Sequence, residues 1–133
     1  MKPYQMLIAD DDRGFRRTLR LVLEPYFVLV EAASGEEAVD IIERRQIDIA
    51  LLDMHMDELT GLETLRFLRS VNASAPGILI TADATDDLRQ DASEENVFSV
   101  LAKPVSKSEL VTTVSTALET AYEDPDVFAM NRG

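Results

Sequence analysis

The sequence predicts a single α/β domain in which a parallel sheet of five strands is covered by five helices on its two faces. Five short apolar runs alternate along the chain with helical patterns, which is the order typical of a parallel sheet. The apolar runs are nearly continuous, as expected for strands that are buried on both faces. With 133 residues, the chain has the length of one domain.

Charge and residue types exclude several classes of function. The chain has 25 Asp and Glu against 13 Lys and Arg, a net charge of −12, which disfavours direct contact with nucleic acid or with an anionic membrane. The lack of cysteine excludes disulfides and thiol catalysis, and the single histidine, His55, excludes any site that needs two. The sequence shows neither a signal peptide nor an apolar run of roughly 20 residues, so we expect a soluble cytoplasmic protein.

The first predicted elements lie before residue 31. The apolar run 6–9 is a strand that ends at three consecutive aspartates, 10–12. Apolar residues then recur at helical spacing over 13–24, and Pro25 ends that helix. The run 27–30 has the length and composition of a second strand.

A capping motif marks the start of the second helix. Ser34 and Glu37 have the spacing of a capping box, which begins a helix that runs to about Arg45. The apolar run 47–52 follows as the third strand, and Asp53 comes directly after it. This nearly continuous apolar run fits a strand of a parallel sheet that is buried on both faces.

The second half of the chain repeats the alternation. Thr60 and Glu63 form another capping box at the start of the third helix. The run 78–81 is the fourth strand, and a short, polar, acidic helix is expected over 85–95. The run 97–102 is the fifth strand, and it ends at a Lys-Pro pair.

The fifth helix begins with a third capping box, Ser106 with Glu109. Its apolar residues continue at helical spacing to Ala121. The tail 124–133 follows, and we expect it to be frayed. No repeat, low-complexity tract or linker interrupts the pattern, which indicates one domain.

Polar residues that suit a reaction stand at the ends of four predicted strands. Asp10 and Asp11 follow the first strand, Asp53 follows the third, Thr81 ends the fourth and Lys103 follows the fifth. In an open parallel sheet these ends share one edge, where ligands bind. Carboxylates placed together repel one another unless a cation joins them, and Mg²⁺ commonly binds carboxylate and phosphate oxygens. A cation, a lysine and a hydroxyl beside Asp53 suit phosphoryl transfer to that carboxylate.

Two other charged features have simpler interpretations. The second strand ends near Glu31 and carries no comparable functional group. Arginines cluster on the first helix, where a solvated face is the expected interpretation and a docking surface for an acidic partner is the alternative. These arginines are Arg13, Arg16, Arg17 and Arg20.

Taken in order, the motifs resemble those of the receiver domains of two-component response regulators, in particular the stand-alone chemotaxis-type receivers. The resemblance covers residues 4–123, nearly the whole chain. It implies a doubly wound, flavodoxin-like fold with the strand order 2-1-3-4-5. The segments that carry it are 7–11, 51–56, 61–63, Thr81-Ala82 and Lys103-Pro104.

The resemblance implies a role for each matching residue at the predicted sheet edge. Asp53 would accept the phosphoryl group. Asp11 and Asp53 would bind Mg²⁺ directly, together with the backbone carbonyl of His55, and Asp10 would assist through water. Thr81 would move its hydroxyl toward the phosphoryl oxygens.

Further implied roles concern the fifth strand and the entrance to the site. Lys103 would pair with the phosphorylated aspartate. Pro104 would follow a cis peptide bond, which proline tolerates. The side chain of His55, together with Asp83, is expected to line the entrance and to tune the lifetime of the phosphoryl group.

The implied function is a phosphorylation-dependent signalling switch of a two-component system or phosphorelay. A sensor histidine kinase or a phosphotransfer protein would supply the phosphoryl group. The surface formed by the fourth helix, the fifth strand and the fifth helix would then change its binding to a downstream protein target. The protein would be a monomer or a phosphorylation-linked dimer. It would be no enzyme toward an external substrate and would catalyse only its own phosphorylation and dephosphorylation.

Departures from the family pattern leave alternatives open. Asp57 stands where receivers commonly have proline, and Val100 stands where many have an aromatic residue that couples to the threonine. A degenerate receiver that docks partners without phosphorylation is therefore one alternative. A Mg²⁺-dependent phosphohydrolase is another, but that class generally needs a second acid where this chain has His55.

Overall fold

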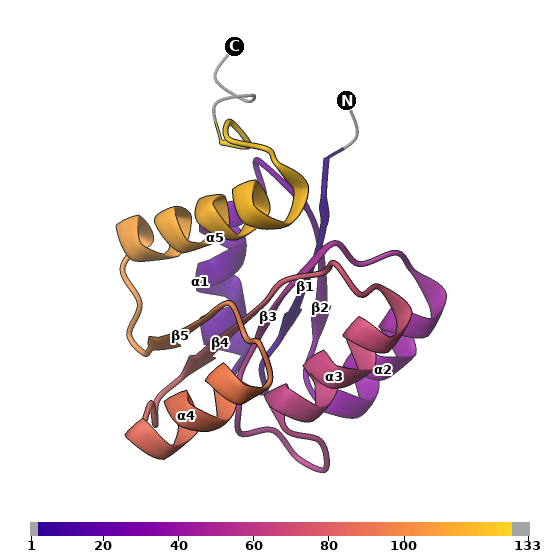
Figure 1. Ribbon diagram of the computed structural model, residues 1–133, viewed down its shortest axis with the longest axis vertical. Helices are drawn as coiled ribbons and strands as arrows, with labels where there is room; N and C mark the ends of the chain where they lie inside the picture. Colours follow the sequence, from indigo (N-terminus) through magenta and orange to yellow (C-terminus); the bar gives the residue numbers. More distant parts are fainter. Residues whose placement is uncertain (1–2, 129–133) are drawn as a thin grey trace.

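The sheet has five parallel strands in the order β2-β1-β3-β4-β5 in the computed structural model, which describes residues 3–128 (Figure 1). The strands are β1 (Gln5–Ala9), β2 (Val28–Ala32), β3 (Ile49–Leu52), β4 (Gly77–Thr81) and β5 (Ser99–Ala102). The helices are α1 (Arg13–Leu23), α2 (Gly35–Arg44), α3 (Gly61–Val71), α4 (Asp86–Glu94) and α5 (Lys107–Tyr122). The predicted fold class and strand order are confirmed.

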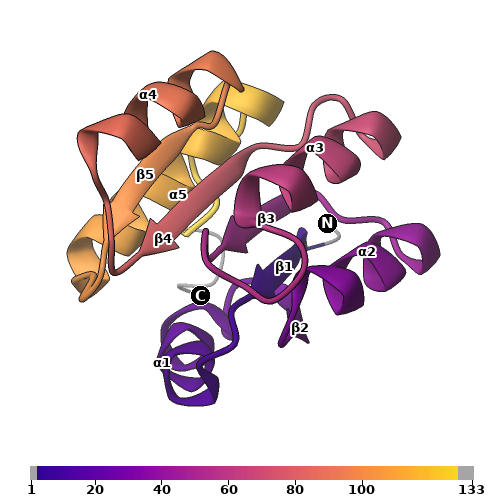
Figure 2. The same cartoon turned by 90° about the horizontal axis from the view of Figure 1, so that it is seen from below.

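The helices form two layers with the sheet between them (Figure 2). α1 and α5 cover one face, and α2, α3 and α4 cover the other. Side chains alternate between these faces along each strand. In β1, Met6 and Ile8 pack under α1 and α5, while Leu7 and Ala9 pack under the other three helices. The inner strands β3 and β4 are buried along their whole length, which explains why their residues are almost entirely apolar.

Each helix begins at a short polar side chain that caps it. The capping oxygen accepts a hydrogen bond from the backbone N–H three residues further on, at Asp12, Ser34, Thr60, Thr85 and Ser106. At the start of α3, the backbone N–H of Thr60 also donates a hydrogen bond to the carboxylate of Glu63, at 3.0 Å. Within the described residues, Thr60 and Glu63 therefore form both hydrogen bonds of a capping box. The predicted boxes at Ser34 and Ser106 form only one of the two bonds, in which the serine side chain accepts.

The described part of the C-terminal tail packs near the start of β2. Val127 is buried, and the ring of Phe128 lies edge-on to the rings of Tyr26 and Phe27, with centroids 4.8 and 5.6 Å apart. The prediction of a frayed tail is therefore wrong for residues 124–128, because their apolar side chains find an aromatic cluster to pack against. The rest of the tail lies outside the described residues.

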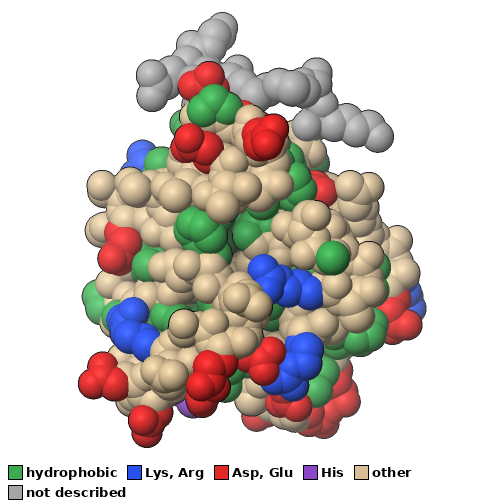
Figure 3. All heavy atoms as spheres, in the orientation of Figure 1, with side chains coloured by type: hydrophobic (Ala, Val, Ile, Leu, Met, Phe, Trp, Pro, Cys, Tyr) green, Lys and Arg blue, Asp and Glu red, His purple; other side chains and the backbone are tan. Residues whose placement is uncertain are grey.

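The surface has the acidic character that the net charge of −12 requires. Figure 3 shows acidic side chains spread over this face of the molecule, with several gathered along its lower edge. Among the helices formed by residues 3–128, none combines the length and the apolar character needed to cross a bilayer.

Candidate functional site

Asp53 lies at the carboxyl end of β3, in the middle of the sheet. Its backbone N–H donates to the carbonyl of Ala9 at 2.8 Å, which extends the pairing of β1 with β3 by one residue. The residue is only 7% exposed, and its Oδ1 accepts a hydrogen bond from the backbone N–H of His55 at 3.3 Å. The start of α3 approaches it closely, since a Cβ on Gly61 would lie 2.6 Å from the Asp53 carbonyl oxygen. Glycine is therefore required there.

Asp10 and Asp11 follow β1 and lie beside Asp53. Asp10 is buried, and its Oδ1 accepts a hydrogen bond from the backbone N–H of Asp12 at 2.8 Å, whereas Asp11 is exposed. One carboxylate oxygen from each of Asp10, Asp11 and Asp53 lies within 4.8 Å of the others. The predicted cluster of three carboxylates is confirmed. Its all-oxygen composition, with one member open to solvent, fits Mg²⁺, which keeps water ligands.

Lys103 brings a positive charge to the same group of carboxylates. Its Nζ lies 2.8 Å from Oδ2 of Asp10 and 3.7 Å from Oδ2 of Asp53, and 4.4 Å from the ring centroid of Phe15. The backbone N–H of Lys103 donates to the carbonyl of Thr81 at 2.9 Å, and the Lys103–Pro104 peptide bond is cis, as predicted. Burial lowers the pKa of Lys103, but the hydrogen bond to Asp10 and the attraction of the carboxylates outweigh it and raise the pKa above its usual value.

The surroundings of Asp53 make its charged form costly. Burial raises the pKa of Asp53 above its usual value, and repulsion from Asp10 adds to that rise. Lys103 and the N–H of His55 oppose the rise but do not cancel it. A carboxylate that is short of positive charge attracts a cation, which agrees with the fit of the oxygen cluster to Mg²⁺.

Thr81 ends β4, next to β3. It is fully buried, and its Oγ1 accepts a hydrogen bond from the backbone N–H of Asp83 at 3.3 Å. The hydroxyl thus contacts the loop that leads from β4 into α4.

The side chains of His55 and Asp83 contact each other at the surface of the protein. Nε2 of His55 is 3.9 Å from Oδ2 of Asp83, and both side chains are mostly exposed, at 62% and 70%. They come from the loops that follow β3 and β4. Their contact joins these two loops at the surface.

Two departures from the family pattern have clear structural consequences. Asp57 is exposed in the loop after β3, so it adds charge without displacing a buried group. Val100 packs against the core beneath α2, α3 and α4, while Phe98 packs on the opposite face of the sheet. β5 itself holds no aromatic residue, so no ring from this strand faces α4.

The sequence did not predict the ion pairs that Glu31 makes. The end of β2 was expected to carry no comparable group, but the two carboxylate oxygens of Glu31 accept hydrogen bonds from Arg16 and Arg20 at 3.0 and 2.7 Å. Half of the arginine cluster on α1 is therefore not a solvated face. The signal was the four-residue spacing of these arginines, which places both on one side of the helix.

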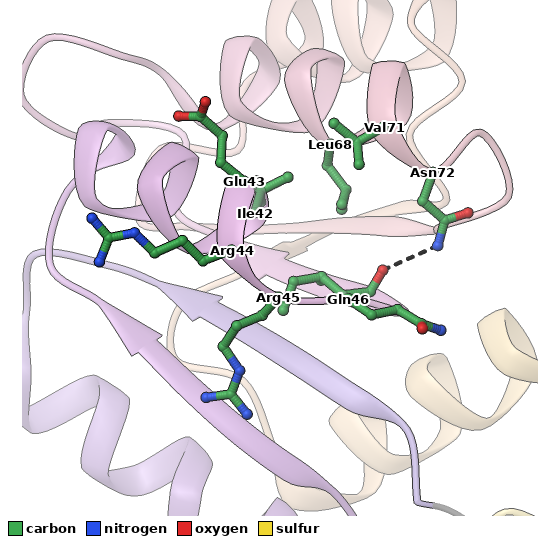
Figure 4. Close-up of a pocket in the computed structure, with 9 residues that line it drawn as sticks. Ile42, Glu43, Arg44, Arg45, Gln46, Leu68, Val71 and Asn72 are labelled. Carbon is green, nitrogen blue, oxygen red and sulfur yellow. Dashed lines mark hydrogen bonds between the residues drawn. The ribbon is translucent and has the colours of Figure 1, made fainter.

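A separate cavity of ≈ 480 Å³ lies between the C-terminal ends of α2 and α3 (Figure 4). Helices in this fold run opposite to the strands, so this cavity lies at the other edge of the sheet from Asp53. In Figure 4, the Asn72 side chain is hydrogen-bonded rather than directed at a ligand, and it donates to the carbonyl of Ile47 at 3.1 Å. The cavity is lined by Ile42, Glu43, Arg44, Arg45, Gln46, Ile47, Leu68, Val71 and Asn72.

Comparison with known sequences gives a consistent result. The family model of the response regulator receiver domain matches residues 6–115. The transcriptional regulatory protein GlrR of Escherichia coli strain K12 is 36% identical over 120 residues, which cover 89% of this chain and 27% of GlrR. The chain therefore spans little more than a quarter of that relative.

Solved structures have the same arrangement. A CheY-like receiver domain protein from Methanospirillum hungatei has a TM-score of 0.86 at 21% identity, with 92% of this chain and 98% of that chain covered. A chain in the CheX–CheY–BeF3–Mg²⁺ complex from Borrelia burgdorferi has a TM-score of 0.81 at 26% identity, with 88% and 90% covered. At 21% identity, the similarity to the Methanospirillum hungatei structure shows only that the two proteins share a fold.

Proposed function

Because the chain belongs to the response regulator receiver domain family, whose members are phosphoryl-accepting switches of two-component systems, we propose that Asp53 is the residue that accepts the phosphoryl group. The observation that carries this proposal is the convergence of four side chains. Asp53 lies with Asp10 and Asp11 in a cluster whose oxygens are within 4.8 Å of one another. Lys103 is 3.7 Å from Asp53.

Mg²⁺ is the proposed metal ion of the site. Asp11 and Asp53 would bind it directly with the backbone carbonyl of His55, and Asp10 would assist through water. The exposure of Asp11 supports this assignment, because it leaves the solvent side open for water ligands. When bound, Mg²⁺ neutralises charge on the carboxylates and on the phosphoryl oxygens.

In the proposed transfer, a carboxylate oxygen of Asp53 attacks the phosphorus of the donor. The bond from phosphorus to the donor's histidine nitrogen breaks, and its electron pair leaves on that nitrogen. Lys103 Nζ now lies 2.8 Å from Asp10 and 3.7 Å from Asp53. It would then move from Asp10 toward the new negative charge on Asp53. The charge of Lys103 would in this way stabilise the product.

The hydroxyl of Thr81 would report phosphorylation to the surface. It now accepts a hydrogen bond from the N–H of Asp83, and its O–H would donate a hydrogen bond to a phosphoryl oxygen once one is present. The loop into α4 would shift with it and change what the α4–β5–α5 surface binds. With Val100 in β5, the threonine would act there without an aromatic partner.

The finer assignments of partners and context are also proposals. The phosphoryl donor would be a sensor histidine kinase or a phosphotransfer protein, and the target a downstream protein. The receiver would span residues 4–123, act in the cytoplasm as a monomer or a phosphorylation-linked dimer, and make no direct contact with nucleic acid or membrane. Its catalysis would be limited to its own phosphorylation and dephosphorylation. A docking role without phosphorylation is not favoured, since the complete set of charged site residues is present.

The proposal is tested by the intact mass of the protein after incubation with acetyl phosphate and Mg²⁺. The wild-type protein should gain the mass of one phosphoryl group, and removal of Mg²⁺ with a chelator should prevent the gain. Asp53→Asn should gain nothing, whereas the control Asp40→Asn, at an exposed position of α2, should behave as wild type. A wild-type protein that gains no mass under any of these conditions would favour the docking role instead.

A further inference from the structure

Arg16 contacts the backbone of the acidic loop that follows β1. Its guanidinium donates from Nη1 to the carbonyl oxygen of Asp10 at 2.5 Å. This carbonyl belongs to the peptide that joins Asp10 to Asp11, so the contact holds the orientation of that peptide plane. Arg16 lies in α1, and its side chain is only 13% exposed.

Glu31 at the end of β2 holds Arg16 in place. Nε of Arg16 donates to Oε1 of Glu31 at 3.0 Å, and Nε of Arg20 donates to Oε2 at 2.7 Å. Burial acts to raise the pKa of Glu31, but the hydrogen bonds and charges of the two arginines together outweigh it and lower the pKa below its usual value. Arg20 also pairs with Glu24 at 3.4 Å. The two arginines are thus balanced by two glutamates, and the network adds no net charge beside the acidic cluster.

The backbone of Asp10 is fixed on both sides as a result. Its N–H donates to the carbonyl of Ala32, the last residue of β2, at 3.0 Å, and its carbonyl accepts from Arg16. Both supports therefore come from β2, one directly and one through Glu31. The carboxylate of Asp10 is held separately, by the N–H of Asp12 and by Lys103. The exposed Asp11, by contrast, depends on the backbone that carries it.

From these contacts we infer that Arg16, oriented by Glu31, is a positioning residue for the metal-binding loop, and that it sets the direction in which Asp11 presents its carboxylate. The inference rests on the proposed Mg²⁺ site. Groups that orient metal ligands commonly change metal affinity tenfold or more when they are removed. Arg16 does so here through a peptide carbonyl, without touching the carboxylate that binds.

The test compares Arg16→Gln with Arg17→Gln, which removes the same charge from an exposed position on the same helix. Mg²⁺ affinity is measured by isothermal titration of the folded protein. Arg16→Gln should weaken binding by about tenfold, and Arg17→Gln by less than about twofold. Arg16→Lys keeps the charge but loses the planar fork, so it should recover part of the affinity. Glu31→Gln should weaken binding in the same direction as Arg16→Gln.

Hydrogen exchange of the metal-free protein separates this inference from the proposed function. The amides of Asp11 and Asp12 should exchange faster in Arg16→Gln than in wild type or Arg17→Gln, whether or not any metal binds. If the wild type binds no Mg²⁺, the proposed metal site fails, and the exchange rates still decide whether Arg16 positions the loop. Equal Mg²⁺ affinity and equal exchange in the two variants would overturn the inference.

Discussion

Lys103 is bound to Asp10 more closely than to Asp53, with its Nζ 2.8 Å from Oδ2 of the first and 3.7 Å from Oδ2 of the second. The lysine thus offsets the charge of the buried Asp10 and leaves that of Asp53 only partly balanced. Because the charge of Asp53 is only partly balanced, a metal cation at the site would stabilise this carboxylate. A movement of Lys103 toward Asp53 would have the same effect.

We predict that Lys103→Met lowers the free energy of unfolding by about 2 kcal/mol in the presence of a chelator, because it leaves buried carboxylates without their cation. Adding Asp53→Asn to this variant should restore about 1 kcal/mol, since it removes one of the charges that repel one another. Urea denaturation gives both values. Lys107→Met, at an exposed position of α5, should stay within about 0.5 kcal/mol of wild type. A loss of the same size at Lys107 would show that the effect is not specific to the site.

Mg²⁺ should stabilise the wild-type protein in proportion to the logarithm of its concentration once the site fills. Asp11→Asn removes an exposed carboxylate of the cluster and should require at least about tenfold more Mg²⁺ for the same rise in melting temperature. The matched control is Asp12→Asn, because asparagine caps a helix as well as aspartate does. An identical Mg²⁺ response in Asp11→Asn and wild type would remove Asp11 from the metal site.

Thr81→Ala should still accept a phosphoryl group but lose most of the structural response to it. The reason is that the hydroxyl which contacts the N–H of Asp83 is gone. Amide NMR shifts in α4 and β5, recorded before and after phosphorylation, measure the response. Thr81→Ser keeps the hydroxyl and should respond as wild type does. A full response in Thr81→Ala would mean that another group carries the signal.

Tyr4, which lies far from the acidic cluster, should make the free energy of unfolding depend on pH in the alkaline range. Its hydroxyl donates to Asp124 at 2.8 Å, and burial together with this hydrogen bond raises the pKa of Tyr4 from 10.0 to about 12. The unfolded chain therefore loses the Tyr4 proton first, so the stability from this group is present below pH 10.0 and is lost as the pH rises through about 12.

The corresponding measurement compares Tyr4→Phe with wild type in urea denaturation at a series of alkaline pH values. The free energy of unfolding should fall more steeply with pH in the wild type, by at most the slope of one proton. Tyr122, which stacks on Tyr4 with ring centroids 5.4 Å apart, is present in both proteins. Parallel slopes would show that Tyr4 titrates normally in the folded state.

Much of the fold and of the site could be predicted from the sequence. Apolar runs and capping residues such as Thr60 place the elements, because both depend on neighbours along the chain. The meeting of Asp10, Asp11 and Asp53 follows from parallel strands whose ends share an edge. These features need only the local pattern and the fold class.

The features that the sequence did not predict depend on which distant side chains meet. Glu31 has no local mark of a functional residue, and its role comes from the arginines that α1 places beside it. Phe128 carries no periodic pattern, yet the rings of Tyr26 and Phe27 hold it in place. Such contacts are set by packing between elements, which spacing along the chain does not specify.

The central claim is that Asp53, and no other acid of the cluster, receives the phosphoryl group. Borohydride reduces an acyl phosphate of aspartate to homoserine, so peptide mapping of the reduced, phosphorylated protein locates the acceptor directly. We predict homoserine at position 53 in the wild-type protein after treatment with acetyl phosphate and Mg²⁺. Homoserine at Asp10 or Asp11, with Asp53 unmodified, would contradict the account.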